Sequence, residues 1–200
     1  MELQLASKSP RRRELLDQIG VRYKVVSVDV PEQREPSESP LAYVTRLALS
    51  KSEAGAQAFP GLPTLGSDTI VVCDGKVLEK PADFDDFRRM MRLLSASSHS
   101  VITAVAVCVT DEQGCLLSEQ TCADYSATDV CFRSLSDIEI EQYWQTGEPQ
   151  DKAGGYAIQG LGATFVREIH GSYSGVVGLP IETLVPLLDD HGVKVWNTGI

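Results

Sequence analysis

The sequence lacks any apolar run long enough to span a membrane. Its longest run, at residues 105–109 with their neighbours, falls well short of the ~20 residues that a spanning helix needs. The first residues also lack the charged and then apolar layout of a secretory signal. We therefore expect a cytoplasmic protein with no membrane partner.

The sequence lacks the cysteine spacing of the common cysteine sites. The cysteines are odd in number, form no C-x-x-C pair and mostly lie in apolar, strand-like runs. We expect them to be reduced, small buried side chains. They are Cys73, Cys108, Cys115, Cys122 and Cys131. The histidines His99, His170 and His191 lack the spacing of a zinc site, so we expect structural or surface roles for them.

Three common motifs are also missing. No G-x-x-x-x-G-K-[ST] phosphate loop is present, and Gly160-x-Gly162 lacks the third glycine of a dinucleotide-binding fingerprint. Residues 171–175 read G-S-Y-S-G, with a tyrosine where a nucleophilic serine would stand. The sequence therefore argues against the P-loop, Rossmann and serine hydrolase classes.

Basic residues are outnumbered by acidic ones, 18 to 28, which gives a net charge of −10. A field of this sign repels nucleic acids and anionic membrane surfaces, so we expect no nucleic-acid partner. The charge is unevenly distributed along the chain. Residues 1–24 carry six basic and three acidic residues, a net charge of +3, which leaves −13 for the rest of the chain.

The 200 residues, of which 42% are hydrophobic and 23% charged, are typical of a folded globular chain. A chain of this length buries about 70% of its unfolded surface. It has no internal repeat and no linker, so we expect one domain over residues 1–200. Expected strands and helices alternate, which predicts an α/β fold with a mixed sheet.

Strands are expected at residues 2–6, 23–28, 64–72, 76–79, 101–109, about 116–123, 128–132 and 163–169. Helices are expected at residues 10–20, 40–57, 83–94, 136–147 and 181–190. The pairs Ser9-Pro10 and Ser39-Pro40 each combine an N-cap residue with a proline at the first helical position. We expect the polar residues 66–69 to interrupt their strand and Pro186 to kink the last helix.

Three arginines, Arg11 to Arg13, stand in the first turn of the first expected helix. Cations at a helix N-terminus oppose the helix dipole and destabilise the helix unless an anion is bound. The pattern therefore indicates either a phosphate-binding site or a solvated face with surface ion pairs.

A second candidate site is Asp68-Thr69, within a β-branched run. A carboxylate there can hold a divalent cation or orient a water molecule, although a turn in which Asp68 accepts backbone hydrogen bonds explains it equally well. Lys80 precedes the rigid Pro81, which suits a fixed charge on a phosphate. An ordinary surface lysine is the alternative.

A third candidate site lies at residues 151–160, with glycines at 154, 155 and 160 that let the backbone approach a ligand closely. Lys152 and Gln159 flank them, and an amide such as Gln159 can both donate to and accept from a base edge. A structural glycine-rich turn explains the glycines equally well.

The segments that hold these candidates resemble the Maf family of nucleoside triphosphate pyrophosphatases. The matching segments are LASKSPRR at 5–12, GSDTIV at 66–71, LEKP at 78–81, DKAGGY at 151–156 and the stretch from GSY at 171 to GLP at 178–180. The resemblance covers nearly the whole chain. It implies an elongated mixed β-sheet flanked by helices, as in inosine triphosphatase, with two lobes about a central cleft, and commonly a homodimer.

The resemblance also implies an activity: a nucleoside triphosphate is hydrolysed between its α- and β-phosphates, with Mg²⁺, Mn²⁺ or Co²⁺ as the divalent metal. The Ile158-Gln159-Gly160 sequence resembles the branch that acts on dTTP and UTP, which leaves CTP and modified pyrimidine nucleotides open. A specificity of the 7-methyl-GTP type is an alternative. So is a nucleotide-binding regulator of septum formation without significant turnover.

Roles follow from the same resemblance, position by position. Asp68 is the expected general base and metal ligand, and Glu32 is the second expected metal ligand. Substrate specificity is expected from Arg12, Thr69 and Gln159. Phosphate binding is expected from Ser7, Ser9, Arg11, Arg12, Lys51, Lys80 and Lys152. The chain departs from the family at Lys8 and at Ser67, where many members have alanine.

Overall fold

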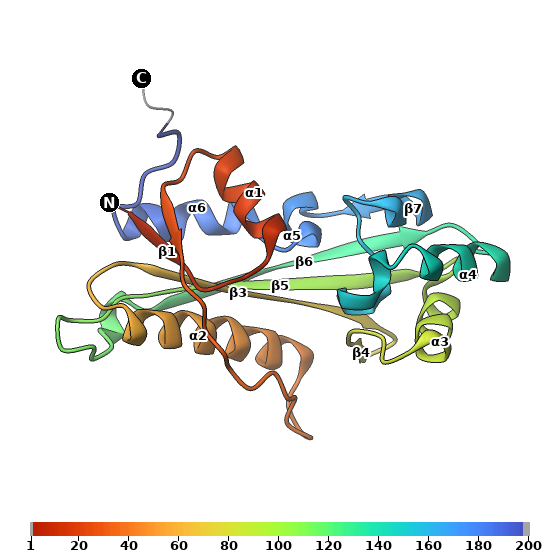
Figure 1. The fold of residues 1–200 in the computed structure, drawn as a ribbon, viewed down its shortest axis with the longest axis horizontal. Coiled ribbons are helices and arrows are strands. Elements are labelled where there is room, and N and C mark those ends of the chain that lie inside the picture. The colour runs from red at the N-terminus through yellow and green to blue at the C-terminus, as the bar shows by residue number, and fades with distance from the viewer. Residues whose placement is uncertain (1, 198–200) are drawn as a thin grey trace. The chain divides into compact units, whose positions relative to one another are not determined.

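The computed structural model describes residues 2–197 and contains a mixed seven-stranded sheet, in the order β2-β1-β3-β5-β6-β7 with β4 paired to β3 (Figure 1). The strands are β1 (Leu3–Leu5), β2 (Tyr23–Val25), β3 (Thr64–Cys73), β4 (Lys76–Leu78), β5 (Ser98–Cys108), β6 (Cys122–Phe132) and β7 (Val166–His170). The α-helices are α1 (Pro10–Gln18), α2 (Pro40–Ala58), α3 (Phe84–Leu94), α4 (Asp137–Gln145), α5 (Tyr173–Val177) and α6 (Ile181–Asp190). The predicted α/β class is confirmed.

The chain divides into two compact units. Unit 1 contains residues 2–68, 103–126 and 178–197 of the described chain, and unit 2 contains residues 69–102 and 127–177. Strands β3, β5 and β6 contribute residues to both units. Within residues 2–197, no helix combines the length and the apolar character needed to cross a membrane.

In unit 1, β1 pairs in parallel with both β2 and β3. Parallel neighbours need crossover connections, and α1 and α2 supply them. The core contains Leu3 and Leu5 of β1 and Val44 and Leu47 of α2, all almost fully buried.

In unit 2, β3 turns into β4 at Asp74-Gly75, where both residues have positive φ, as a tight hairpin turn requires. Rings from α3 and α4 pack against each other at tilted angles: the centroid of Phe87 lies 5.1 Å from that of Trp144 and 6.1 Å from that of Tyr143. This aromatic cluster buries Phe87 completely and joins the two helices.

The predicted interruption of β3 is wrong, because the strand runs unbroken from Thr64 to Cys73. Gly66 is there for close packing rather than for a turn. A Cβ at Gly66 would lie 2.1 Å from the carbonyl oxygen of Ala48 and 2.5 Å from the nitrogen of Ser52, both in α2. A glycine inside a strand often marks such a close backbone approach.

The other differences lie at element boundaries. The expected strand at 116–123 is largely wrong: residues Ser118–Gln120 form a 3₁₀ turn, closed by a bond from the Thr121 N–H to the Ser118 carbonyl, and β6 begins at Cys122. Residues 163–165 belong to a 3₁₀ turn, so β7 begins at Val166. Helix α6 has the predicted bounds, Ile181–Asp190, and contains Pro186.

The cysteine prediction is only partly right. All five thiols are free, as expected, but only Cys73 and Cys108 are buried. Cys122 and Cys131 are half-buried, and Cys115 is exposed in the turn before β6.

Candidate functional site

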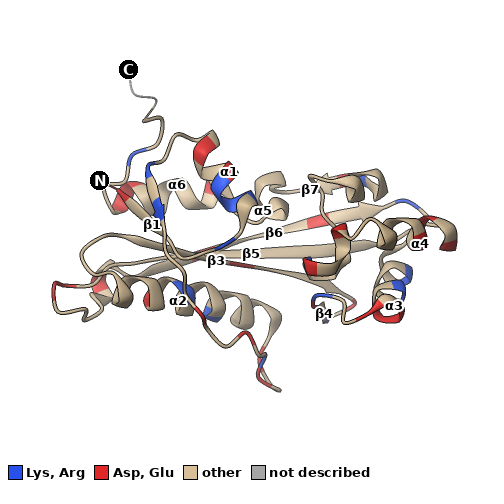
Figure 2. Ribbon diagram, in the orientation of Figure 1, with Lys and Arg blue, Asp and Glu red and all other residues tan. Residues whose placement is uncertain are grey.

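The start of α1 is a helix end that is rich in positive charge. Ser9 is the N-cap residue and Pro10 the first helical residue, as predicted, but the Ser9 side chain forms no capping hydrogen bond within the described chain. The first turn contains Arg11, Arg12 and Arg13 and no acidic residue. Figure 2 shows these basic residues at the start of α1. The helix dipole and the side chains therefore favour the same ligand, an anion.

Arg12 links this turn to two other segments of unit 1. Its Nε donates to the carbonyl oxygen of Gly178 at 2.9 Å, and its Nη1 donates to Ser7 Oγ at 3.0 Å. Ser7 Oγ also accepts from the backbone N–H of Ser9 at 3.2 Å. Ser67 Oγ donates to the same Gly178 oxygen at 3.2 Å. Three of the predicted phosphate ligands, Ser7, Ser9 and Arg12, are thus held together.

The guanidinium groups carry an electrostatic cost. Burial lowers the pKa of Arg12; the Asp68 carboxylate counters this, while the Arg11 charge adds to it. Glu32 also counters the lowering. Arg11 Nε is buried and has no hydrogen-bond partner among residues 2–197. A buried donor without an acceptor is unusual, and an oxygen of a bound anion would satisfy it.

Asp68 lies opposite Lys51 of α2. The Lys51 Nζ is 2.6 Å from Asp68 Oδ1 and 2.6 Å from Glu32 Oε1, so one ammonium bridges two carboxylates. The side chains of Lys51 and Asp68 are only 12% and 14% exposed, whereas that of Glu32 is 48% exposed. The structure therefore brings together three predicted site residues from three separate segments.

Close packing between α2 and β3 sets the position of Lys51. Ser52 Oγ, one residue later in α2, donates to the carbonyl oxygen of Thr64 at 2.5 Å. Gly66 leaves room for α2 to lie directly against β3. As a result, the Lys51 ammonium reaches the Asp68 carboxylate.

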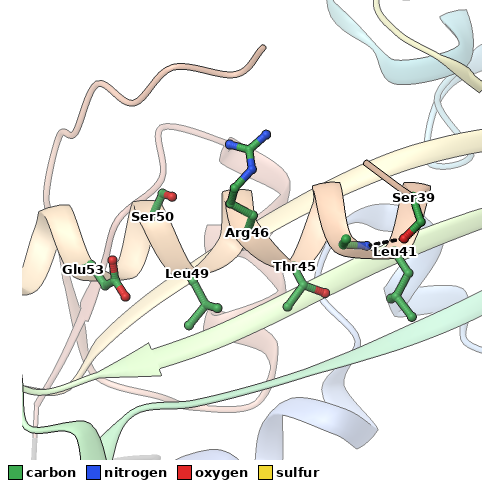
Figure 3. Close-up of a pocket in the computed structure, with 8 residues that line it drawn as sticks. Ser39, Leu41, Thr45, Arg46, Leu49, Ser50 and Glu53 are labelled. Carbon is green, nitrogen blue, oxygen red and sulfur yellow. Dashed lines mark hydrogen bonds between the residues drawn. The ribbon is translucent and has the colours of Figure 1, made fainter. Parts of the chain in front are cut away.

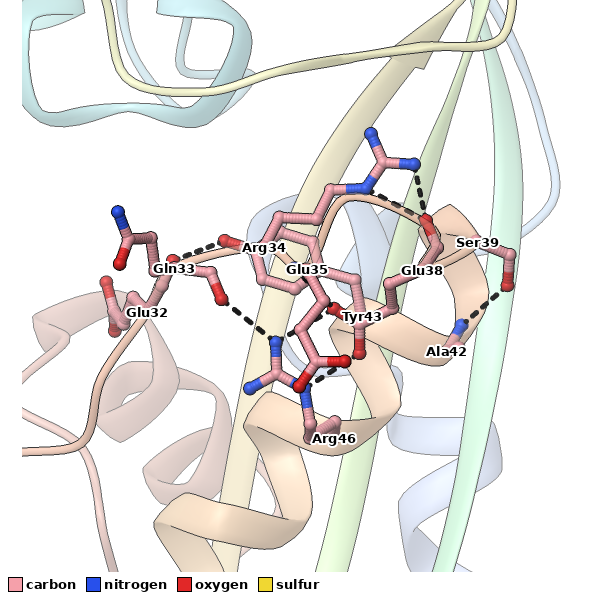
Figure 4. Close-up of polar contacts among 9 residues, drawn as sticks. All are labelled: Glu32, Gln33, Arg34, Glu35, Glu38, Ser39, Ala42, Tyr43 and Arg46. Carbon is pink, nitrogen blue, oxygen red and sulfur yellow. Dashed lines mark hydrogen bonds and ion pairs between the residues drawn. The ribbon is translucent and has the colours of Figure 1, made fainter.

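The loop that carries Glu32 is fastened to α2 by two side chains (Figure 4). Tyr43 OH donates to the Glu32 carbonyl oxygen at 2.6 Å, and Arg46 Nη2 donates to the Gln33 carbonyl oxygen at 3.0 Å. Arg46 also binds both carboxylate oxygens of Glu38, at 2.7 and 2.8 Å, and these bonds lower the pKa of Glu38. These hydrogen bonds hold the acidic segment between β2 and α2 against the helix.

The pair Glu32 and Asp68 fits a divalent cation. Carboxylate oxygens are the ligands that Mg²⁺ and similar hard cations prefer. Both carboxylates already share one positive charge, the Lys51 ammonium. These two residues could hold the metal that the family resemblance implies.

Two predicted site residues of unit 2, Lys80 and Lys152, lie on neighbouring loops, whereas Thr69 lies within β3. The Gly154 N–H donates to the carbonyl oxygen of Glu79 at 3.1 Å, which ties the segment of Lys152 to that of Lys80. Gly154 has φ +67°, and a Cβ there would lie 2.8 Å from the Val71 side chain. The Lys152 ammonium is paired with the Asp151 carboxylate.

Gln159 is exposed on a turn that Glu148 holds rigid. The Glu148 carboxylate accepts from the N–H groups of Leu161 at 2.9 Å and Gly162 at 3.0 Å, and from Tyr143 OH at 2.7 Å. Burial favours the neutral form of Glu148, but these hydrogen bonds prevail and lower its pKa. Gln159 therefore presents its amide from a fixed backbone.

The family model described as "Maf-like protein" matches residues 2–191. The chain belongs to the Maf family. Three similar relatives are each named "dTTP/UTP pyrophosphatase". The protein of Saccharophagus degradans is 55% identical over 200 residues, which cover 98% of this chain and 91% of the relative. That of Pseudoalteromonas translucida is 50% identical over 92% of this chain and 94% of its own. That of Vibrio parahaemolyticus is 51% identical, with 90% and 92% covered.

Some residues that position this Maf-family site escaped the sequence reasoning. Tyr43 and Arg46 hold the Glu32 loop, and Ser67 shares the Gly178 carbonyl with Arg12. Ser67 and Gly178 are 111 residues apart in the chain, and no local pattern connects the two.

An open depression lies along α2 (Figure 3). Its lining residues are Ser39, Leu41, Ala42, Thr45, Arg46, Leu49, Ser50 and Glu53. Within the described residues, none of those that line the depression was predicted as a site residue. Ser39 is the N-cap of α2, since its side chain accepts from the Ala42 N–H at 3.2 Å. The depression is therefore a surface feature outside the candidate site.

Proposed function

We propose that this chain is a nucleoside triphosphate pyrophosphatase that hydrolyses dTTP and UTP to the nucleoside monophosphate and pyrophosphate. The observation that carries the proposal is the bridge from Lys51 to Asp68 and Glu32, in the same unit as the arginine-rich start of α1. The choice of pyrimidine nucleotides rests on the names of relatives that are 50–55% identical over at least nine-tenths of this chain.

The triphosphate binds at the start of α1. The helix N-terminus, Arg11 and Arg12 supply positive charge, and the buried Nε of Arg11 gains an acceptor. Ser7 and Ser9 add hydroxyl groups to this turn, and Lys51, Lys80 and Lys152 are further phosphate ligands in the proposal. Transfer of a phosphoryl group spreads negative charge over several oxygens, so fixed cations of this kind stabilise the transition state.

Asp68 acts as the general base. A carboxylate can orient a water molecule and accept its proton as the oxygen attacks the α-phosphorus. The bond from the α-phosphorus to the bridging oxygen then breaks, and pyrophosphate leaves with the electron pair. Lys51 keeps the Asp68 carboxylate in one orientation through the 2.6 Å contact.

Glu32 and Asp68 would hold a divalent cation such as Mg²⁺, Mn²⁺ or Co²⁺, which when bound supplies charge neutralisation and Lewis acidity. Arg12, Thr69 and Gln159 select the substrate in this proposal. The Gln159 amide offers a donor and an acceptor from a rigid turn, which suits the edge of a pyrimidine base.

The proposal includes a single catalytic domain over residues 1–200 that works as a homodimer in the cytoplasm, without nucleic-acid or membrane partners. Light scattering on the purified protein measures the oligomeric state. A monomeric mass at working concentration contradicts the dimer and leaves the catalytic proposal standing.

The test of the activity is release of pyrophosphate by the wild type and by Asp68→Asn, with Asp189→Asn, an exposed aspartate of α6, as the matched control. Asp68→Asn should lose about 100-fold or more in kcat, because a general base contributes at least that much. Retention of more than about a tenth of wild-type kcat contradicts the role of Asp68.

A panel of substrates tests the specificity: dTTP, UTP, CTP, modified pyrimidine triphosphates, ATP, GTP and 7-methyl-GTP. Preference for dTTP and UTP supports the proposal. Equal rates on purine and pyrimidine nucleotides contradict the specificity, a preference for 7-methyl-GTP assigns the chain to the other branch, and binding without release of pyrophosphate favours a regulator.

A further inference from the structure

Four residues with metal-binding side chains stand on one face of the β6–β7 pair in unit 2. The two strands are antiparallel, with Cys131 opposite Glu168 and Asp129 opposite His170. Side chains directly opposite each other share a face, and so do residues two apart along a strand. Cys131, Asp129, Glu168 and His170 therefore form a two-by-two array.

Three of these side chains are close enough to share one ion. The thiol sulfur of Cys131, a carboxylate oxygen of Glu168 and a ring nitrogen of His170 all lie within 4.8 Å of one another. His170 Nε2 and Glu168 Oε1 are 3.3 Å apart. Ligands of a tetrahedral zinc ion lie about 2.0–2.3 Å from the metal, so small side-chain rotations would complete the geometry.

The donors point to zinc rather than to magnesium. A thiolate, an imidazole and a carboxylate are the ligands of zinc sites, whereas Mg²⁺ prefers oxygen ligands alone. Cys131 forms no disulfide. Glu168 and His170 are 51% and 61% exposed, and β7 is the last strand in the order of the sheet, so an ion can reach the array from solvent.

The pairing of the strands is irregular at the same place. Its register shifts between Cys131 and Phe132. Irregularities of this kind re-aim a side chain on the bulged strand and often stand beside functional sites. The shift adjoins the thiol, which is the ligand that distinguishes this array from an ordinary surface ion pair.

We propose that Cys131, Glu168 and His170 bind one Zn²⁺ ion, with Asp129 or water at the fourth position. The ion would join β7 to β6, because its ligands come from both strands. This site uses none of the residues assigned to hydrolysis, so it goes beyond the proposed function and can fail independently of it.

The test uses metal-free full-length protein in excess Mg²⁺, titrated with Co²⁺ as a spectroscopic probe for zinc. One equivalent of Co²⁺ should produce thiolate-to-cobalt charge-transfer absorption in the near ultraviolet, and Zn²⁺ should displace it. Cys131→Ser should abolish this absorption. His170→Asn should weaken Co²⁺ binding at least about tenfold, since even the loss of an outer-shell partner typically costs about 10–100-fold.

Two control variants separate this site from others. Cys115→Ser removes an exposed thiol outside the array, and Asp68→Asn removes the proposed catalytic carboxylate; both should keep the absorption. The proposal is overturned if the wild type shows no thiolate absorption at one equivalent, or if the absorption survives Cys131→Ser or is lost in Cys115→Ser. Circular dichroism checks folding, and the exposed His170 variant decides the question if Cys131→Ser does not fold.

Discussion

Helices α1 and α3 begin in opposite ways. In α3, Asp83 is the N-cap and accepts from the Asp86 N–H at 2.9 Å, acidic residues occupy the first turn, and Arg92 stands in the last turn. This order of charges follows the helix dipole, with each favourable charge contributing about 0.3–1 kcal/mol. Figure 2 shows the acidic start and the basic residues further along α3.

In α1 the order is reversed. Arginines fill the first turn, Ser9 forms no capping bond with any described residue, and Glu14 and Asp17 follow further along the helix. The charges of α3 therefore favour the stability of the helix, whereas the start of α1 keeps a positive end that opposes folding. Functional sites commonly retain such a cost in stability. The reversal is what an anion-binding helix end requires.

The largest expected effect of a substitution in these two helix starts is at Arg12. Arg12→Gln should lower kcat/KM for dTTP and UTP by about 100-fold or more, because removal of one donor to a developing oxyanion costs about 10²–10³. The matched control is Arg13→Gln in the same turn, whose side chain is exposed and should cause a much smaller loss. Equal losses in the two variants would show that only the net charge of the turn matters.

Unit 2, which contains α3, also buries a histidine for packing. His99 is 3% exposed, its Nε2 lies 2.8 Å from Tyr156 OH, and burial lowers its pKa to about 4. In the unfolded chain His99 takes up a proton below about pH 6.5, whereas in the folded protein it does so only below about pH 4. The free energy of unfolding should therefore decrease as the pH falls through this window, by about 3 kcal/mol from this residue.

Denaturant unfolding of the wild type and of His99→Gln between pH 7 and pH 4 measures this contribution. The variant keeps a hydrogen-bonding side chain but cannot titrate, so its stability should fall less steeply over the window of pH 6.5 to 4. Parallel curves for the two proteins would show that His99 is not held neutral by the fold.

At the start of α3, Asp83→Ala should lower the free energy of unfolding by about 1 kcal/mol, the usual cost of losing an N-cap side chain. Turnover of dTTP should stay at the wild-type value, since α3 contributes no residue to the proposed site. Thermal unfolding and a pyrophosphate assay on the same preparation give both values. A large loss of activity without loss of stability would assign α3 a role in catalysis.

The smallest expected effect is a gain in stability. Arg13→Glu places a negative charge in the first turn of α1, where the dipole favours it, and should raise the free energy of unfolding by about 0.3–1 kcal/mol. The measurement is denaturant unfolding at low ionic strength. A loss of stability would mean that the arginines of this turn are already neutralised within the folded chain.

Local patterns predicted the helix starts, and tertiary packing accounts for the errors. The pairs Ser9-Pro10 and Ser39-Pro40 marked the starts of α1 and α2 correctly, because a proline at the first helical position is a local feature of the sequence. Only Ser39 also forms a capping hydrogen bond among the described residues. The predicted break in β3 is wrong because Gly66 makes room for the backbone of α2, which is distant in the sequence, and does not form a local turn.

The residues of the candidate site also fall into two groups, those that the local sequence indicates and those that only the fold brings together. The arginines at the start of α1 and the polar Asp68 stood out from the residues themselves. Lys51 and Glu32 did not, because each looks ordinary in its own segment and only the fold brings both to Asp68. The family resemblance selected them, and the ion pairs of the structure supply a physical reason for the choice.

The central claim is that the start of α1 binds the triphosphate while Asp68 performs the chemistry. The most direct test measures dTTP binding by calorimetry and pyrophosphate release for the wild type, Asp68→Asn and Arg12→Gln. The account predicts that Asp68→Asn still binds dTTP but releases less than about a tenth as much pyrophosphate per unit time. Arg12→Gln should bind weakly. Rapid turnover by Asp68→Asn, or unchanged binding by Arg12→Gln, would contradict it.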